Sequence, residues 1–168
     1  MIKTFKGGEA AVTQRILVAL DDSENAMRAV EFTAKTFSKE QKITLFSVIP
    51  DTAAIICNID GPTLSPYFKS KQAGFCDLED KKRELLEQAL EKGRGVLLKE
   101  GFKDENITIK AHPKKKGIAR DIVEEAGSGY DILVLGRRGL SAIQEFILGS
   151  VSQKVLHMAK DMSIVVVN

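Results

Sequence analysis

The sequence predicts a single α/β domain built on an open, five-stranded parallel sheet with helices on both faces. Two observations predict this fold class. Short runs of consecutive apolar residues recur along the chain, and such runs are typical of parallel strands that are buried on both faces. Between them lie segments whose apolar residues keep the spacing of an amphipathic helix. The resulting order, β-α-β-α-β-α-β-α-β, fits parallel strands joined by helical crossovers.

The first half of the chain begins with a buried strand at 15–20, "RILVAL", which ends at the polar group "DDS". Serine and aspartate are preferred helix N-caps, so we expect a helix to begin near Ser23. Its core-facing positions keep helical spacing: Ala26, Ala29, Val30, Thr33, Ala34 and Phe37. A second strand is expected at 42–50, "KITLFSVIP", because this run is β-branched and aromatic and a proline stops it.

Residues 51–75 show no periodicity and carry two glycines and two prolines, so we expect a long variable loop. A loop of this length is uncommon in a compact domain and is usually functional or disordered. Two interpretations stay open: the apolar stretch "TAAIICNI" packs near a ligand or a partner chain, or the loop is a flexible excursion. The next segment, 77–101, has leucines on one face and ends at Gly101, which predicts a long amphipathic helix.

The second half of the chain continues the same alternation. Strands are expected at 106–112, 131–136 and 163–167. One helix is expected in "GIARDIVEEAGSG" (117–129) and another at 151–159. The apolar face of the first of these helices is formed by Ile118, Ile122, Val123 and Ala126.

Length and composition exclude several classes of protein. We expect one domain over residues 15–168 behind a polar leader, 1–14. A formal net charge of +2 and the absence of tryptophan argue against a nucleic-acid partner. The longest apolar runs are about five residues, far short of the roughly 20 that a membrane helix needs. Cys57 and Cys76 lie 19 residues apart without a CxxC motif or an export signal, so we expect reduced thiols and a cytoplasmic location.

The segment after the fourth strand, "GRRGLSAIQEFILGS", is the strongest candidate for a binding site. Ligands of open α/β sheets bind beyond the carboxyl ends of the strands, where the strand order reverses. Gly136 and Gly139 would let the backbone approach a ligand and adopt positive φ. Gly149 and Ser150 precede a helix whose free N–H groups suit a phosphate. The alternative is an ordinary turn at Gly149 with Ser150 as a plain N-cap.

This pattern, Gly-x2-Gly-x9-Gly-Ser, resembles the nucleotide-binding signature of the universal stress protein family. The similarity covers nearly all of residues 14–168 and includes "RILVALDDSENA", "FSVIPD", "DILVLGRRG" and "GSVSQKVL". The resemblance implies a Rossmann-like, adenine nucleotide alpha-hydrolase-like fold and membership of the branch that binds ATP, together with Mg²⁺. It also implies a homodimer in which the last strands, 163–167, pair across a two-fold axis.

The resemblance also assigns individual residues. Asp21 would meet the ribose or a phosphate-bound metal, and its alternative role is to cap the following helix. Backbone groups of Val48 would read the adenine edge, and Leu135 would approach the ribose. Ala19 and Leu20 would line the nucleoside. The phosphates would be held by Gly136, Gly139, Gly149, Ser150 and Val151.

Other charged residues leave two interpretations each. Arg137 and Arg138 lie inside the glycine segment, where they either reach a triphosphate or stay in solvent. The first interpretation makes Arg138 a further candidate for nucleotide binding. The run "HPKKKG" (112–117) is either a solvated loop or a contact for a phosphate or an acidic partner. The chain departs from the family at Ala119 and Ser163, where prolines are common.

The function expected from the sequence is a binding module for ATP that acts in a stress response or in signalling. The alternative is a slow ATP hydrolase or phosphotransferase. No Walker motif is present, and the sequence places no histidine or glutamine beside Asp21 and Asp22 to position a water molecule. AMP as the native ligand is a third possibility. His112 and His157 have no partners at metal-ligand spacing, so we expect no metal site made of them.

Overall fold

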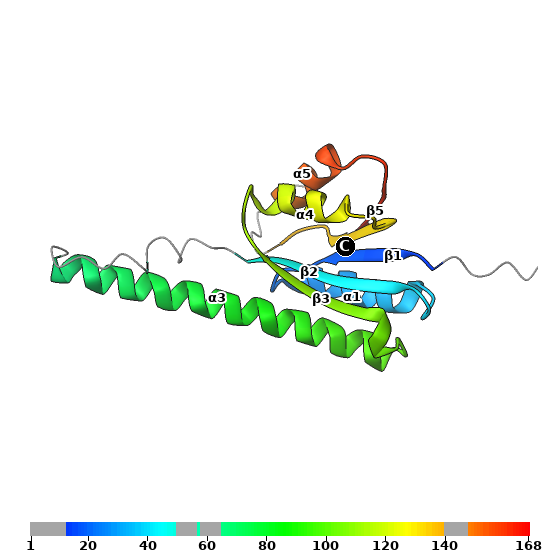
Figure 1. The fold of residues 1–168 in the computed structure, drawn as a ribbon, viewed down its shortest axis with the longest axis horizontal. Coiled ribbons are helices and arrows are strands. Elements are labelled where there is room, and N and C mark those ends of the chain that lie inside the picture. Colours follow the sequence, from blue (N-terminus) through cyan, green and yellow to red (C-terminus); the bar gives the residue numbers. More distant parts are fainter. Residues whose placement is uncertain (1–12, 50–56, 58–64, 140–147) are drawn as a thin grey trace, which may run out of the picture.

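The computed structural model describes residues 13–49, 57, 65–139 and 148–168. Five strands and four helices make up the described fold (Figure 1). In chain order they are β1 (Arg15–Ala19), α1 (Glu24–Thr36), β2 (Lys42–Ile49), α3 (Pro66–Lys99), β3 (Ile107–Pro113), α4 (Ile118–Ala126), β4 (Ile132–Gly136), α5 (Ser150–Met158) and β5 (Ser163–Val167). A short 3-10 helix, Asp104–Asn106, leads into β3. None of the described helices is long and apolar enough to cross a bilayer.

The five strands form one parallel sheet in the order β3-β2-β1-β4-β5. The predicted fold class is therefore confirmed. The chain first moves outward from β1 to β2 and β3, and then returns to the other side of β1 to add β4 and β5. This reversal places a topological switch point between β1 and β4, where open α/β sheets offer a crevice for a ligand.

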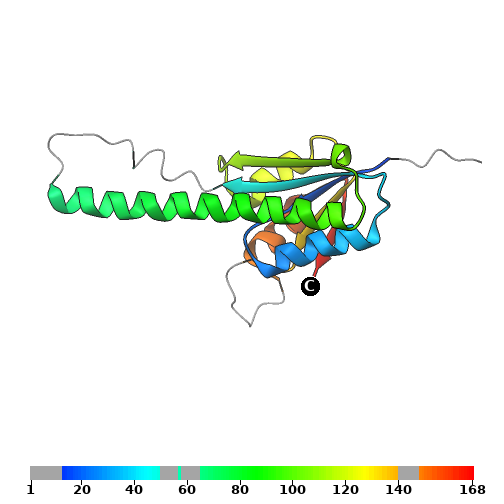
Figure 2. The same ribbon diagram turned by 90° about the horizontal axis from the view of Figure 1, so that it is seen from below.

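Each face of the sheet has its own apolar core, because the buried strands alternate their side chains between the two faces. α1 and α3 cover one face, and α4 and α5 cover the other (Figures 1 and 2). Buried under α1 and α3 are residues such as Ile16, Val18, Leu20, Leu45, Leu90 and Val134. Buried under α4 and α5 are residues such as Leu17, Ala19, Phe46, Val48, Leu133 and Leu135.

Helix α3 begins at Pro66, so the prediction of a loop through residue 75 was wrong. Proline is well tolerated in the first turn of a helix, where its missing N–H needs no partner. The amino-terminal half of α3 projects beyond the sheet (Figures 1 and 2), and Tyr67 and Leu78 there are 73% and 55% exposed. A helix without a core to face needs no apolar stripe, and for this reason periodicity did not reveal it.

The expectation of reduced thiols was also wrong, because Cys57 and Cys76 form a disulfide with a Cα–Cα distance of 6.0 Å. The extension of α3 explains the error. It places Cys76 on a helix, within 6.0 Å of Cys57 between the Cα atoms, which sequence spacing alone does not show. The reduced thiols that supported a cytoplasmic location are therefore not present in this structure.

The carboxyl end of α3 has the geometry that its sequence predicts. Gly101 has a φ of +96°, and its N–H donates to the Leu98 carbonyl at 3.0 Å. The N–H of Phe102 donates to the Leu97 carbonyl at 3.1 Å. These two hydrogen bonds form a Schellman motif, which satisfies carbonyl groups at the end of a helix.

Gly95 lies within α3 and Gly101 lies just after its end, and substitutions of these two glycines are expected to change stability in opposite directions. A Cβ at Gly101 or at the exposed Gly95 would meet nothing within 4 Å, so neither substitution creates a clash. Gly101→Ala forces a side chain into the left-handed region and is expected to lower the free energy of unfolding by about 1 kcal/mol. Gly95→Ala is expected to raise it by about 1 kcal/mol, because alanine is the better helix former. Urea denaturation measures both, and changes of the same sign would contradict this account of α3.

Candidate functional site

The candidate site lies where the carboxyl ends of β1 and β4 meet. The two strands are neighbours, and Ala19 at the end of β1 pairs with Leu135 of β4. Three of the predicted segments therefore converge at this edge: the turn after β1, the glycine segment after β4 and the start of α5. They converge because parallel strands all direct their carboxyl ends to the same edge of the sheet.

Asp21 connects the first two of these segments. Its Oδ1 accepts hydrogen bonds from the Ser23 N–H at 3.1 Å and from the Ser23 hydroxyl at 2.5 Å. Ser23 is the N-cap of α1, and its Oγ accepts from the Ala26 N–H at 3.2 Å. Asp21 therefore orients the capping residue instead of capping α1 itself. On its other side, a Cβ placed on Gly139 would lie 2.5 Å from Asp21 Oδ2, so this carboxylate lies directly against the glycine segment.

The three glycines of the segment allow close contacts between backbone segments of the protein. A Cβ on Gly136 would lie 2.7 Å from the Asn25 carbonyl oxygen in the first turn of α1. A Cβ on Gly149 would lie 3.1 Å from Arg138 Cα. None of the three has a positive φ, so that part of the sequence-based expectation was wrong. The structure shows close approach of the backbone toward α1 and within the turn, and approach to a ligand stays a prediction.

The amino terminus of α5 leaves donors available. Gly149 is the N-cap, so the alternative of Ser150 as the capping residue was wrong. The first hydrogen bond of the helix runs from the Gln153 N–H to the Gly149 carbonyl, at 2.9 Å. The N–H groups of Ser150, Val151 and Ser152 precede it and have no acceptor among the described residues. Ser150 is exposed, and its hydroxyl is likewise without a partner there.

Ser152 is a residue that the sequence analysis missed. Its side chain is buried, and its hydroxyl donates to the Gly136 carbonyl at 2.8 Å. This bond joins α5 to the end of β4, and the Gly149 N–H, which donates to the Arg137 carbonyl at 2.9 Å, adds a second link. The signal for Ser152 was its position on the buried face of a helix, where a hydroxyl group needs a hydrogen-bond partner.

The apolar candidates divide between the two faces of the sheet. Ala19, Val48 and Leu135 are buried in the core under α4 and α5, and Val151 packs against that core while it stays partly buried. Leu20 is buried in the opposite core, under α1 and α3. The structure thus brings four of the predicted nucleotide contacts to one face and leaves the side chain of Leu20 on the other.

Two cavities border the candidate residues. One, of about 450 Å³, lies between α1 and α3 and is lined by Asp21, Asp22 and Gln88, among others. The other, of about 980 Å³, lies between the start of α4 and α5. Of the predicted site residues, only Val151 lines this larger cavity. Its described lining includes four cationic side chains and no carboxylate: Lys114, Lys116, Arg120 and Lys154.

The basic turn before α4 is shaped by a buried carboxylate. Asp121 Oδ2 accepts from the N–H of Lys115 at 2.8 Å and of Gly117 at 3.4 Å, and Oδ1 accepts from the N–H of Lys116 at 2.9 Å. Burial alone raises the pKa of Asp121, but these backbone donors together hold that pKa below its ordinary value. Ile118, which was expected on the buried face of α4, is 40% exposed because Ala119 and Asp121 take that face.

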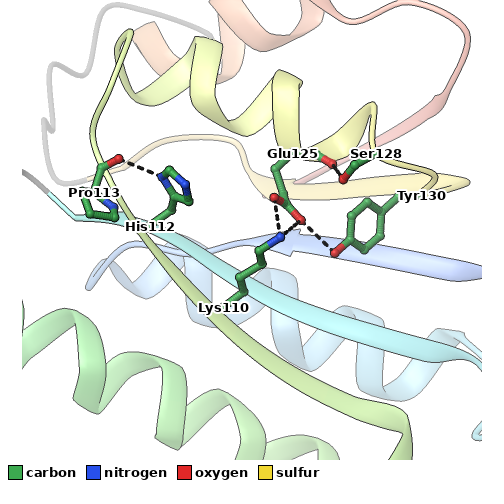
Figure 3. Close-up of polar contacts among 6 residues, drawn as sticks. All are labelled: Lys110, His112, Pro113, Glu125, Ser128 and Tyr130. Atoms are coloured by element: carbon green, nitrogen blue, oxygen red, sulfur yellow. Dashed lines mark hydrogen bonds and ion pairs between the residues drawn. The ribbon is translucent and has the colours of Figure 1, made fainter.

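A second polar cluster fixes α4 against β3 (Figure 3). Lys110 Nζ donates to both carboxylate oxygens of Glu125 at 2.8 Å, and the Tyr130 hydroxyl donates to Glu125 Oε1 at 3.0 Å. The hydrogen bond to Glu125 raises the pKa of Lys110. Nearby, the ring of His112 contacts the Pro113 carbonyl through Nδ1 at 2.9 Å. Lys110, Glu125 and Tyr130 thus satisfy one another and hold the carboxyl-terminal end of α4 against β3.

Asp21 is the residue of the candidate site that could ligate a metal ion. Among the described residues, no three His, Cys, Asp or Glu side chains gather as metal ligands do. A Mg²⁺ ion beside Asp21 would therefore take one carboxylate from the protein, and phosphate oxygens and water would complete its coordination. This donor set is typical of Mg²⁺ bound together with a nucleotide.

Comparison with known proteins gives a family match over most of the chain. Residues 13–167 match the model of the universal stress protein family. A universal stress protein of Mycolicibacterium smegmatis is 28% identical over 159 residues, which cover 94% of this chain and 49% of that protein. This chain thus spans about half the length of that relative. Universal stress protein YxiE of Bacillus subtilis is 28% identical over 149 residues, which cover 86% of this chain and 93% of that protein.

Solved structures share the fold at lower identity. A universal stress protein in complex with cAMP has a TM-score of 0.59 and 20% identity, over 93% of this chain and 97% of that one. A universal stress protein family protein from Arabidopsis thaliana with AMP bound has a TM-score of 0.57 and 20% identity, over 92% of this chain and 90% of that one. The likeness at this identity is one of fold.

The buried carboxylate of Asp121 gives stability that depends on pH. Because its pKa is lower in the folded state, Asp121 stabilises the fold above the pKa of the unfolded chain, and this stabilisation is lost as the pH falls through the folded pKa. Asp121→Asn keeps only one accepting oxygen and is expected to lower the free energy of unfolding by about 2 kcal/mol at pH 7.

Urea denaturation of wild type and Asp121→Asn, repeated from pH 7 down to acid, measures this difference. The difference is expected to shrink as the pH falls below the ordinary range of an aspartate. Asp77→Asn, at an exposed position of α3, is the charge-matched control and is expected to change stability by less than about 0.5 kcal/mol. A difference between wild type and Asp121→Asn that stays constant with pH would contradict the role assigned to Asp121.

Proposed function

The chain belongs to the universal stress protein family, and we propose that it is an ATP-binding member, a module that reports the presence of the nucleotide through its loops and a dimer surface. One observation carries the proposal. At the switch point of the sheet, the carboxylate of Asp21 lies against Gly139, next to the N–H groups at the start of α5 that have no acceptor in the described part of the chain. A carboxylate that can accept a hydrogen bond from a ribose or ligate a metal ion thus lies at the same edge of the sheet as a set of N–H donors for phosphate.

The proposed binding mode assigns a task to each segment. Phosphates bind the N–H groups of Ser150 and Val151 and the Ser150 hydroxyl, where the helix dipole favours negative charge. Asp21 Oδ2 accepts from the ribose or holds the Mg²⁺ that neutralises the phosphates. The adenosine part lies toward the face of Ala19, Val48 and Leu135, and the family members bound to cAMP and AMP support an adenine nucleotide there.

Slow ATP hydrolysis is the second candidate, and one observation favours it. Sequence analysis placed no glutamine near Asp21, but Gln88 of α3 lines the same cavity as Asp21 and Asp22. A glutamine near a triphosphate can orient the attacking water. The Gln88 amide donates to Glu84 Oε1 at 3.1 Å and so already has a partner, which places hydrolysis second to binding.

Calorimetry with Mg·ATP tests the binding proposal. Wild type is expected to bind one nucleotide per chain, and Asp21→Asn is expected to bind at least tenfold more weakly, since it lacks the charge beside Gly139. Asparagine keeps an oxygen for Ser23, so the cap of α1 persists. Asp22→Asn removes the same charge one residue away, at an exposed position, and is the matched control with an expected change below twofold.

Three results would decide against parts of this proposal. Equal binding by wild type and Asp21→Asn would show that Asp21 is not part of the site. Absence of heat for every nucleotide would contradict the proposed binding function. Tighter binding of AMP than of ATP would make AMP the native ligand. Phosphate release on the order of 1 s⁻¹, typical of dedicated enzymes, that is lost in Gln88→Ala would favour the hydrolase.

The homodimer is proposed on the edge strand β5. β5 pairs with β4 on one side, and no strand among the described residues covers its other side. Its residues Ile164 to Val167 are only partly buried, and such an apolar edge is normally paired or protected. Light scattering at micromolar concentration is expected to give twice the 18.4 kDa of one chain. Dilution to monomer should expose β5 amides to hydrogen exchange, and a monomer at all concentrations would refute the pairing.

A further inference from the structure

The disulfide between Cys57 and Cys76 lies outside both apolar cores. Cys57 belongs to the segment between β2 and α3, and Cys76 lies within the projecting half of α3. Both residues are partly exposed, and neither is a member of either core cluster. Partial exposure gives a reductant or an oxidant access to the sulfur atoms, which a disulfide inside a core would deny.

The two halves of α3 differ in how they are supported. The carboxyl-terminal half buries Leu86, Leu90 and Leu97, and a Cβ on Gly93 would lie 3.1 Å from Leu45 Cδ1 in the sheet. The amino-terminal half extends past the sheet (Figure 2), with Tyr67 and Leu78 exposed. A helical stretch of about 12–15 residues is marginally stable in water without tertiary support. A covalent link to Cys57 is therefore well placed to stabilise this half.

We propose that Cys57 and Cys76 form a reversible redox site that controls the order of the amino-terminal half of α3. In the oxidised state the disulfide ties this half of α3 to Cys57. In the reduced state the half frays, and α3 begins closer to Leu86, where burial in the core starts. The sheet and both cores persist in either state, because the disulfide contributes to neither. The inference does not depend on nucleotide binding.

The two half-reactions use common cellular reagents. A dithiol reductant attacks one sulfur as a thiolate, the Cys57–Cys76 bond breaks, and the second thiol of the reductant resolves the mixed disulfide. The protein gains two electrons and two protons, and the reductant becomes a disulfide. A hydroperoxide reverses this: it oxidises one cysteine to a sulfenic acid, which the other thiol attacks with loss of water. Two thiols and one hydrogen peroxide thus give one disulfide and two waters.

The chemistry is tested on the full chain in its native state. Protein treated with dithiothreitol or with hydrogen peroxide is alkylated, and the modified cysteines are counted by mass spectrometry. Two alkylated cysteines are expected after the dithiol and none after the peroxide, with the same far-ultraviolet circular dichroism except for a small loss of helix. A disulfide that is reduced only in denaturant would overturn the proposal, as would a disulfide that forms only between chains.

The structural response is tested by hydrogen exchange of the two halves of α3. Reduction is expected to speed exchange at least tenfold in residues 66–80 and to leave residues 86–97 unchanged. Cys57→Ser and Cys76→Ser should each reproduce the reduced pattern. The double variant, which cannot form the bond, is the control, and its hydrogen exchange should be the same with the reductant and with the peroxide. Equal exchange of residues 66–80 in the oxidised and reduced protein would show that the disulfide does not control the helix.

Discussion

The close packing of the end of β4 against the first turn of α1 fixes the geometry at the carboxyl edge of the sheet. The missing side chain of Gly136 lets β4 approach the Asn25 carbonyl, where a Cβ would come within 2.7 Å. This approach brings the glycine segment to the turn after β1, so that Gly139 meets Asp21. The hydrogen bond from Ser152 to the Gly136 carbonyl then places the start of α5 against the same point. A side chain at position 136 would separate all three segments.

The glycines have two explanations: approach to a ligand, which the sequence predicts, and approach to neighbouring backbone, which the structure shows. The two are compatible, and together they show what could be predicted from the sequence and what could not. The sequence placed the glycines after an apolar strand and before a helix, which is sufficient to predict a candidate site at the carboxyl edge of the sheet. The strand order, and with it the reversal between β1 and β4, came from the structure. The sequence could not show which atoms would approach Gly136, because Asn25 is more than a hundred residues away in the chain. The positive φ that was expected for flexibility is absent, and the missing Cβ atoms serve packing instead.

The other errors of the sequence analysis also concern contacts between residues that are far apart in the chain. The five strands and the core face of α1 followed from burial, which leaves a clear pattern in a sequence. The core face of α3 was predicted correctly for Leu86, Leu90 and Leu97 and wrongly for Leu85, which is 40% exposed. The projecting half of α3, the disulfide and Ser152 depend on contacts that leave no such pattern. Residues 66–76 lie on a helix without an apolar face to bury, and the cysteine pair is defined by the position of that helix. Ile118 was misassigned because Asp121, a charged residue, occupies the buried position.

The proposed nucleotide site and the proposed redox site fall at the same end of the sheet, and each rests on separate evidence. Parallel strands need crossovers, so the chain that leaves β2 at Ile49, one residue after Val48, passes through Cys57 before α3 returns to β3. The amino terminus of α3 must therefore lie at the carboxyl edge, and any extension of α3 projects from that edge (Figures 1 and 2). A change in the order of the projecting half therefore takes place at the carboxyl edge and leaves both cores unchanged. The topology of the fold, and not a contact between the two sites, thus brings the proposed redox site and the proposed nucleotide site to one edge of the sheet.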